Sequence, residues 1–213
     1  MTLQYLQAHF AVTVSAISGV LAGSGKRVDL FGVIVLGLVT ALGGGTVRDV
    51  ILETPPVFWI EDSNYVINAV LTAAITFSIA RYWVVPGKVL AIADAFGLAL
   101  FTTLGAVKGL RFEVGAVNAV MMGVITGVAG GMARDVLVGE IPLVFRREIY
   151  LYATAAICGA TVFVVLRQSP AWAPASVVAG TATTLALRLA GIFWRISLPV
   201  FRARHESGHQ GPR

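Results

Sequence analysis

Six ionisable side chains lie within or at the edge of long apolar segments: Arg48, Asp49, Asp94, Lys108, Arg134 and Asp135. A charge in such a segment is expensive to bury, so each is expected to face an opposite charge or water, as in ion and proton pathways. Asp94 and Lys108 are two heptads apart, so they occupy about the same face of one helix, one near each end.

A short phrase that occurs twice in the chain contains two of these charges in each copy. Residues 44–50 read GGTVRDV and residues 130–136 read GGMARDV, an offset of 86 residues. The same offset, without a gap, superimposes Gly19 on Gly105 and Thr40 on Thr126. The chain therefore contains an internal duplication.

Composition indicates what was duplicated. Hydrophobic residues make up 57% of the chain, charged residues only 13%, and the mean hydropathy is +0.82, which leaves too little polar surface for a soluble domain. Continuous apolar runs of roughly 20 residues favour helices over a barrel, in which polar and apolar residues alternate. We predict an all-α integral membrane protein with seven transmembrane helices at about 5–24, 30–52, 65–85, 89–110, 114–138, 149–167 and 174–194.

The duplication and the helix count together predict the topology. Each repeat, 5–85 and 89–167, holds three spans, so the second enters the membrane from the opposite side, with 174–194 as an additional seventh helix. Lys and Arg concentrate in the connections on one side, which predicts an outer amino terminus and a cytoplasmic tail at 202–213. We expect a multi-pass protein of the cell inner membrane whose charge of +5 reflects topology and not nucleic-acid binding.

The inverted layout also predicts partners for the charges. Asp94 falls at the cytoplasmic level of Arg134, and Lys108 falls at the outer level of Asp49, so we expect these two pairs to form between helices. The repeat counterparts of Asp94 and Lys108 are alanines, so the duplication did not require these charges, and they are the stronger functional candidates. The two Arg-Asp dipeptides fit a structural clamp as well as a functional site.

Paired glycines lie at matching depths of the second and fifth predicted helices: Gly44 with Gly45, and Gly130 with Gly131. Tight helix packing is one interpretation of such residues. The other is an interruption of the helix, which turns backbone carbonyls toward a cavity and marks a substrate or ion path. The second interpretation predicts that larger residues reduce flux with little loss of folded protein.

Other chemistry has little support in the sequence. There is no Ser/His/Asp set, and the three histidines lie toward the two ends of the chain, so we expect no enzyme. Cys158 is the single cysteine, and no metal-ligand spacing is present, so we expect neither a metal site nor a cofactor. K⁺ or Na⁺ is the ion expected to permeate, and the sequence does not decide whether a lipid is bound.

The motifs together carry a family resemblance. DAFGLALF at 94–101, and the two Gly-Gly-x-x-Arg-Asp phrases followed by prolines at 55–56 and 142, resemble the prokaryotic trimeric intracellular cation (TRIC) channel family, also described as UPF0126 or glycine-transporter-like. The resemblance covers both repeats. It implies a homotrimer with one pore per protomer, lined by glycine-kinked second and fifth helices, and potassium-permeable cation conduction.

Two functions therefore remain open. A channel would use backbone carbonyls and hydroxyls such as those of Thr40 and Thr126 to replace water around a cation. A secondary transporter of glycine or another small zwitterion would use the same points, with a helix amino end facing the carboxylate. The family resemblance favours the channel.

Overall fold

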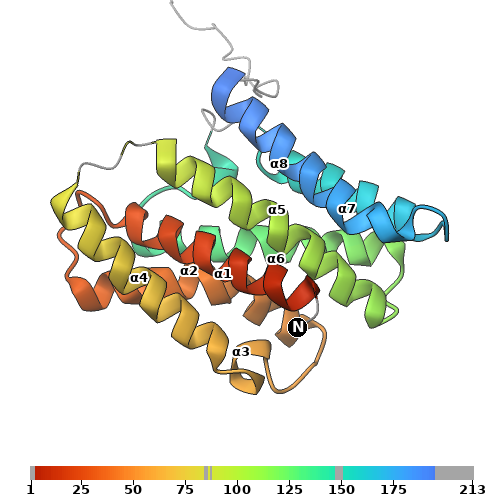
Figure 1. Ribbon diagram of the computed structural model, residues 1–213, viewed down its shortest axis with the longest axis horizontal. Helices are drawn as coiled ribbons and strands as arrows, with labels where there is room; N and C mark the ends of the chain where they lie inside the picture. Colours follow the sequence, from red (N-terminus) through yellow and green to blue (C-terminus); the bar gives the residue numbers. More distant parts are fainter. Residues whose placement is uncertain (1–2, 84–85, 87, 147–150, 195–213) are drawn as a thin grey trace, which may run out of the picture.

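The computed structural model describes residues 3–83, 86, 88–146 and 151–194, and its regular structure in these ranges is helical (Figure 1). The α-helices are α1 (Leu3–Ala22), α2 (Leu30–Ile51), α3 (Phe58–Glu61), α4 (Asn64–Tyr82), α5 (Lys88–Arg111), α6 (Ala116–Leu137), α7 (Ala153–Arg167) and α8 (Ser176–Trp194). Two 3₁₀ turns, η1 (Leu143–Phe145) and η2 (Ala173–Ala175), precede α7 and α8. The expected tail at 202–213 lies outside the described residues.

Six of these helices are long and apolar enough to cross a membrane: α1, α2, α4, α5, α6 and α8. Their bounds agree closely with the runs predicted from the sequence. The predicted span 149–167 contains α7, which has 15 residues and is shorter than the roughly 20 that a perpendicular span requires. The four-residue helix α3 follows the second span and was not predicted, because a single turn has no recognisable periodicity.

The helices form one bundle around α1, α2, α5 and α6 (Figure 1). α4 packs on α1 and α2, while α7 and α8 pair with each other and pack on α5. Small residues allow close approach: a Cβ added to Gly105 would lie 2.6 Å from the carbonyl oxygen of Met122. The bundle brings the charged end of α2 against one end of α5, and the charged end of α6 against the other end.

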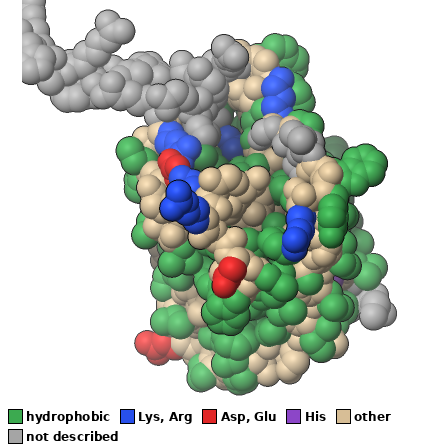
Figure 2. Space-filling model, turned by 90° about the vertical axis from the view of Figure 1, so that its left-hand side faces the viewer, with side chains coloured by type: hydrophobic (Ala, Val, Ile, Leu, Met, Phe, Trp, Pro, Cys, Tyr) green, Lys and Arg blue, Asp and Glu red, His purple; other side chains and the backbone are tan. Residues whose placement is uncertain are grey.

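The outward face of α4 is strongly apolar. Ile67, Leu71, Ile75 and Ile79 follow a four-residue spacing, and each is more than half exposed. Such a stripe on a monomer in water would be an aggregation hazard, whereas hydrocarbon solvates it. Figure 2 shows one end of the molecule, on which Lys and Arg side chains gather in the upper part and hydrophobic side chains lie around and below them. The surface therefore agrees with a multi-pass membrane protein.

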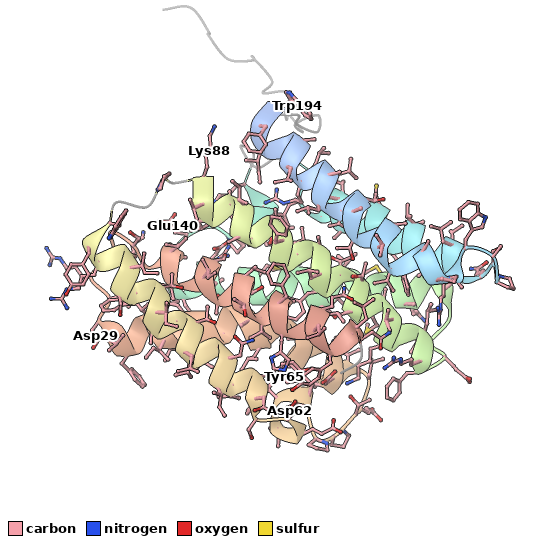
Figure 3. All side chains as sticks on the ribbon, in the orientation of Figure 1. Asp29, Asp62, Tyr65, Lys88, Glu140 and Trp194 are labelled. Carbon is pink, nitrogen blue, oxygen red and sulfur yellow. The ribbon has the colours of Figure 1, made fainter. Side chains whose placement is uncertain are left out.

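Charged groups outside the spans mark one end of the bundle. The ammonium of Lys26 lies 2.5 Å from Glu140, which also accepts a 3.3 Å bond from Arg146. The hydrogen bond from Lys26 and the positive charges of Lys26 and Arg146 lower the pKa of Glu140. Figure 3 shows Asp29, Lys88 and Glu140 toward this end, and Asp62 and Tyr65 near the amino end of α1.

Candidate functional site

The first site, which we name the Lys108 site, comprises Arg48, Asp49, Phe58 and Lys108. Its centre is the carboxylate of Asp49, which is only 1% exposed. One oxygen accepts bonds of 2.7 Å from Arg48 Nε and from Lys108 Nζ. The other accepts the backbone N–H of Phe58 at 3.0 Å. Three donors on α2, α3 and α5 thus satisfy one buried carboxylate.

A cavity of about 380 Å³, which we name the Lys108 cavity, adjoins this site. The ammonium of Lys108 reaches it with a quarter of the side chain exposed, whereas Asp49 is covered. Arg48, Arg111 and Glu61 also line the cavity. Its lining therefore contains three cationic side chains, including that of Lys108, and one carboxylate, that of Glu61. In this arrangement Lys108 neutralises the buried carboxylate while placing a positive charge at the mouth.

The second site, which we name the Asp94 site, lies toward the other end of α5. Arg134 donates to Asp94 at 3.0 Å through Nη1, to Asp135 at 2.8 Å through Nε, and hydrogen-bonds the hydroxyl of Ser18. Asp94 also accepts bonds from Tyr152 at 3.3 Å and from Arg188 at 3.4 Å.

The Asp94 site is more deeply buried than the Lys108 site. Arg134 and Arg188 are at most 1% exposed, and Asp94 is 6% exposed. The guanidinium of Arg188 lies 4.4 Å from the ring centroid of Tyr152, a cation–π contact. Two carboxylates balance two guanidinium groups, so the site is neutral as a whole, and each charge depends on the others.

The structure contains both ion pairs that the sequence predicts, Asp94 with Arg134 and Lys108 with Asp49. Each arginine of the two Arg-Asp phrases also binds the aspartate that follows it. Sequence reasoning missed three members of the Asp94 site. Arg188 carried a usable signal, since it is a charge within the predicted span 174–194. Tyr152 and Ser18 carried none, because their residue types are common in membrane helices.

The paired glycines do not interrupt their helices, so of the two interpretations of these residues the interruption is wrong and the close packing of helices is confirmed. α2 and α6 are continuous through Gly44 and Gly130. A Cβ added to Gly44 would lie 2.0 Å from the carbonyl oxygen of Thr126, and one added to Gly130 would lie 2.3 Å from that of Thr40. The glycines therefore allow direct backbone contact where α2 and α6 cross. The exchange of equivalent partners is the pattern expected for a local two-fold relation.

The second glycine of each pair makes room for a member of a charged site. A Cβ on Gly45 would lie 2.4 Å from the ring of Phe58, next to the Lys108 site. One on Gly131 would lie 3.1 Å from the hydroxyl of Tyr152 and 3.5 Å from Asp94. The missing Cβ therefore leaves room for the ring of Phe58 at position 45, whereas at position 131 the contact with Tyr152 would be only slightly tight.

The hydroxyls of Thr40 and Thr126 do not face an open path in this structure. Thr40 donates to the carbonyl of Leu36 and Thr126 to that of Met122, each at 2.6 Å and each within its own helix. Both threonines are buried, at 6% and 1% exposure. Such a bond to the preceding turn satisfies the hydroxyl in an apolar interior.

We expect Gly44→Ala and Gly130→Ala each to lower the melting temperature of the purified protein markedly, because the new methyl group would meet a backbone carbonyl. Gly43→Ala is the matched control: its Cβ would lie 3.5 Å from Gly130, an ordinary contact. Thermal unfolding of the three variants in detergent checks the prediction. Equal stability of Gly44→Ala and Gly43→Ala would contradict it, and would restore the expectation of reduced flux without loss of folded protein.

Sequence comparison matches the chain to one family along both repeats. A family model described as glycine transporter matches residues 5–81 and 91–168. The UPF0126 inner membrane protein YadS of Escherichia coli is 46% identical over 207 residues, covering 92% of this chain and 94% of that protein. A UPF0126 membrane protein of Vibrio cholerae is 42% identical over 206 residues, covering 94% and 83% respectively.

Structure comparison gives a second set of similar proteins. The TRIC trimeric intracellular cation channel orthologue from Rhodobacter sphaeroides superimposes with a TM-score of 0.86 at 39% identity, over 92% of this chain and all of that one. Another structure, from work on conductance through TRIC cation channels, gives 0.85 at 32% identity, over 95% and 98%. The chain therefore belongs to the UPF0126 family of membrane proteins, whose family model is described as glycine transporter, and it has the fold of the TRIC cation channels.

Proposed function

We propose that the protein is a monovalent cation channel, permeable to K⁺, that forms a homotrimer with one pathway in each protomer. The observation that carries this proposal is the match to a TRIC cation channel over the whole of that chain at 39% identity. The similar solved structures are channels, so the match favours conduction over catalysis.

The two charged sites support a pathway along α5. Asp94 and Lys108 lie on about the same face of this helix, and their partners Arg134 and Asp49 come from α6 and α2. We therefore assign the lining to α2 and α6, with α5 contributing a charge at each end. The carboxylate of Asp49, paired with the partly exposed ammonium of Lys108, is suitable for a cation path that opens when this pair separates.

The described conformation is closed. α2 and α6 touch at Gly44 and Gly130, and the carboxylates of Asp49 and Asp94 are both covered. Opening in this proposal requires Lys108 to leave Asp49, which exposes a carboxylate to the Lys108 cavity. The ammonium of Lys108 and the carboxylate of Asp49 are thus the gate at this end.

The arrangement in the membrane is part of the same proposal. In this arrangement the two matched stretches 5–81 and 91–168 are inverted units, α7 is the third span of the second unit, and α8 is the seventh span. The bias of Lys and Arg among the connections supports an outer amino terminus and a cytoplasmic carboxyl terminus. The Lys108 cavity then opens to the outer side.

A transporter of glycine or a similar zwitterion is the second candidate, favoured by the description of the matching family model. Single-channel recording from purified protein in planar bilayers separates the two. We expect stepwise K⁺ currents far above any transporter turnover. Saturable uptake of labelled glycine by proteoliposomes, without unitary currents, would overturn the channel. Protein-free bilayers and liposomes from the same lipid are the controls.

A further inference from the structure

A large aromatic side chain lies midway between the two charged sites. Asp94, Phe101 and Lys108 follow one another at intervals of seven residues, so they share one face of α5. At 1.5 Å of rise per residue, each interval is about 10 Å. Phe101 therefore occupies the point at which a path from the Lys108 cavity to the Asp94 site would have to pass.

Phe101 belongs both to the cavity and to the hydrophobic core. It lines the Lys108 cavity, yet only 6% of it is exposed. The buried residues of its core cluster come from α1, α2 and α4, and most of them are alanines: Ala11, Val12, Ala16, Ala41, Leu42 and Ala69. Larger side chains that pack on the same cluster, those of Phe58, Tyr65 and Leu104, also line the cavity, so the ring of Phe101 is part of the apolar wall between the cavity and the core.

Polar groups resume directly beyond the ring. One turn further along α5, a Cβ on Gly97 would lie 2.4 Å from the hydroxyl oxygen of Ser15 on α1. One turn further along α1, Ser18 hydrogen-bonds Arg134 of the Asp94 site. Two hydroxyls of α1, those of Ser15 and Ser18, therefore lie between the level of Gly97 and Arg134, the partner of Asp94.

The duplication shows that this ring is a specific feature of the second unit. At the offset of 86 residues, the counterparts of Asp94, Phe101 and Lys108 are Ala8, Ser15 and Ala22. The face of α1 that corresponds to this row thus carries only small side chains. The first unit has no side chain of comparable size at this position.

We propose that Phe101 is a hydrophobic gate that separates the water of the Lys108 cavity from the polar groups of Ser15, Ser18 and Asp94. An apolar constriction of this kind stops ions because water leaves it. The proposal rests on the proposed channel function and adds a barrier distinct from the Lys108–Asp49 pair. Conduction then requires the ring to move as well as the ion pair to separate.

Thiol accessibility tests the gate without any need for current. The chain has one cysteine, so Cys158→Ala gives a cysteine-free background into which Ser15→Cys places a reporter beyond the ring. The probe is a small charged methanethiosulfonate added to purified protein. We compare its rate of reaction in this background with and without Phe101→Ala. Phe163→Ala is the matched control, since Phe163 is 1% exposed and lies outside the lining of the Lys108 cavity.

We expect Phe101→Ala to accelerate modification of the reporter by at least an order of magnitude, and Phe163→Ala to leave the rate unchanged. Melting temperature and gel-filtration profile identify a variant that does not fold. In that case Phe101→Leu, which keeps most of the apolar volume, should give a smaller acceleration in folded protein. Equal rates with Phe101 and its folded replacement would overturn the gate, as would equal acceleration by Phe163→Ala.

Current recording separates this result from the channel proposal. Acceleration together with larger K⁺ currents in Phe101→Ala supports both. If Phe101→Ala accelerates modification of the reporter, but neither the unsubstituted protein nor the variant carries current, Phe101 is a water barrier and the channel is rejected. Currents in the unsubstituted protein, with no change in labelling or current in Phe101→Ala, retain the channel and reject the gate.

Discussion

Replacing Asp94 by Asn is expected to destabilise the protein by about 3–5 kcal/mol, the cost of leaving a buried charge without its partner. Arg134 would keep Asp135, but the site as a whole would carry an excess positive charge next to Arg188. Asparagine has nearly the volume of aspartate, so the effect reports charge rather than a cavity. Denaturation of the detergent-solubilised variant measures it.

Two further variants make this prediction specific. Glu140→Gln also removes a carboxylate with two cationic partners, but the pair is exposed, so its melting temperature should change little. Adding Arg188→Met to Asp94→Asn restores neutrality and should recover part of the lost stability. If Asp94→Asn is no less stable than Glu140→Gln, the buried network does not contribute to the fold as the geometry indicates.

The helices and both ion pairs were predictable because they depend on strong signals. Hydrocarbon requires continuous apolar spans, so the bounds of α1, α2, α4, α5, α6 and α8 follow the composition. The duplication then supplied the depth of each charge. Matching Asp94 with Arg134 and Lys108 with Asp49 needed only the order of the spans and the cost of an unpaired charge.

The role of the paired glycines could not be derived in the same way. A missing Cβ permits both a break in a helix and close contact between two helices, and the residue type is identical in the two cases. The choice depends on what lies opposite, which for Gly44 is the carbonyl of Thr126. Thr40 illustrates the same limit, because a hydroxyl suited to a cation is equally suited to its own helix carbonyl.

Phe101 shows a third limit of sequence reasoning. In a chain that is 57% hydrophobic, one phenylalanine in an apolar helix carries no signal of its own. Its position becomes informative only when the cavity on one side and the hydroxyls on the other are known. The charges at each end of α5 could be predicted, but the barrier that we propose between them could not.

In the proposed channel, Lys108→Met is expected to increase the K⁺ current. The ammonium both closes the path by binding Asp49 and adds positive charge to the Lys108 cavity, so its removal favours entry of cations. Methionine keeps much of the length and apolar volume of the lysine stem. Open probability and unitary current in planar bilayers measure the effect, and Lys26→Met, which removes a lysine paired with exposed Glu140, is the control.

The structure also predicts that Lys108→Met remains stable. Asp49 would keep the 2.7 Å bond from Arg48 and the 3.0 Å bond from the backbone of Phe58, so its charge would not be left alone. The loss should therefore be well below the roughly 3–5 kcal/mol of an uncompensated buried charge. A cation that can leave without unfolding the protein is what a gate requires, whereas a structural clamp would be indispensable.

Stability and current together decide between these roles. A stable Lys108→Met protein with increased current assigns the ammonium to the gate. An unstable Lys108→Met protein that regains stability on adding Asp49→Asn would instead make the pair a clamp, because the damage would come from the bare carboxylate. Arg48 of α2 and the backbone N–H of Phe58 on α3 already donate hydrogen bonds to Asp49. Lys108 of α5 is therefore the partner whose departure the site can tolerate.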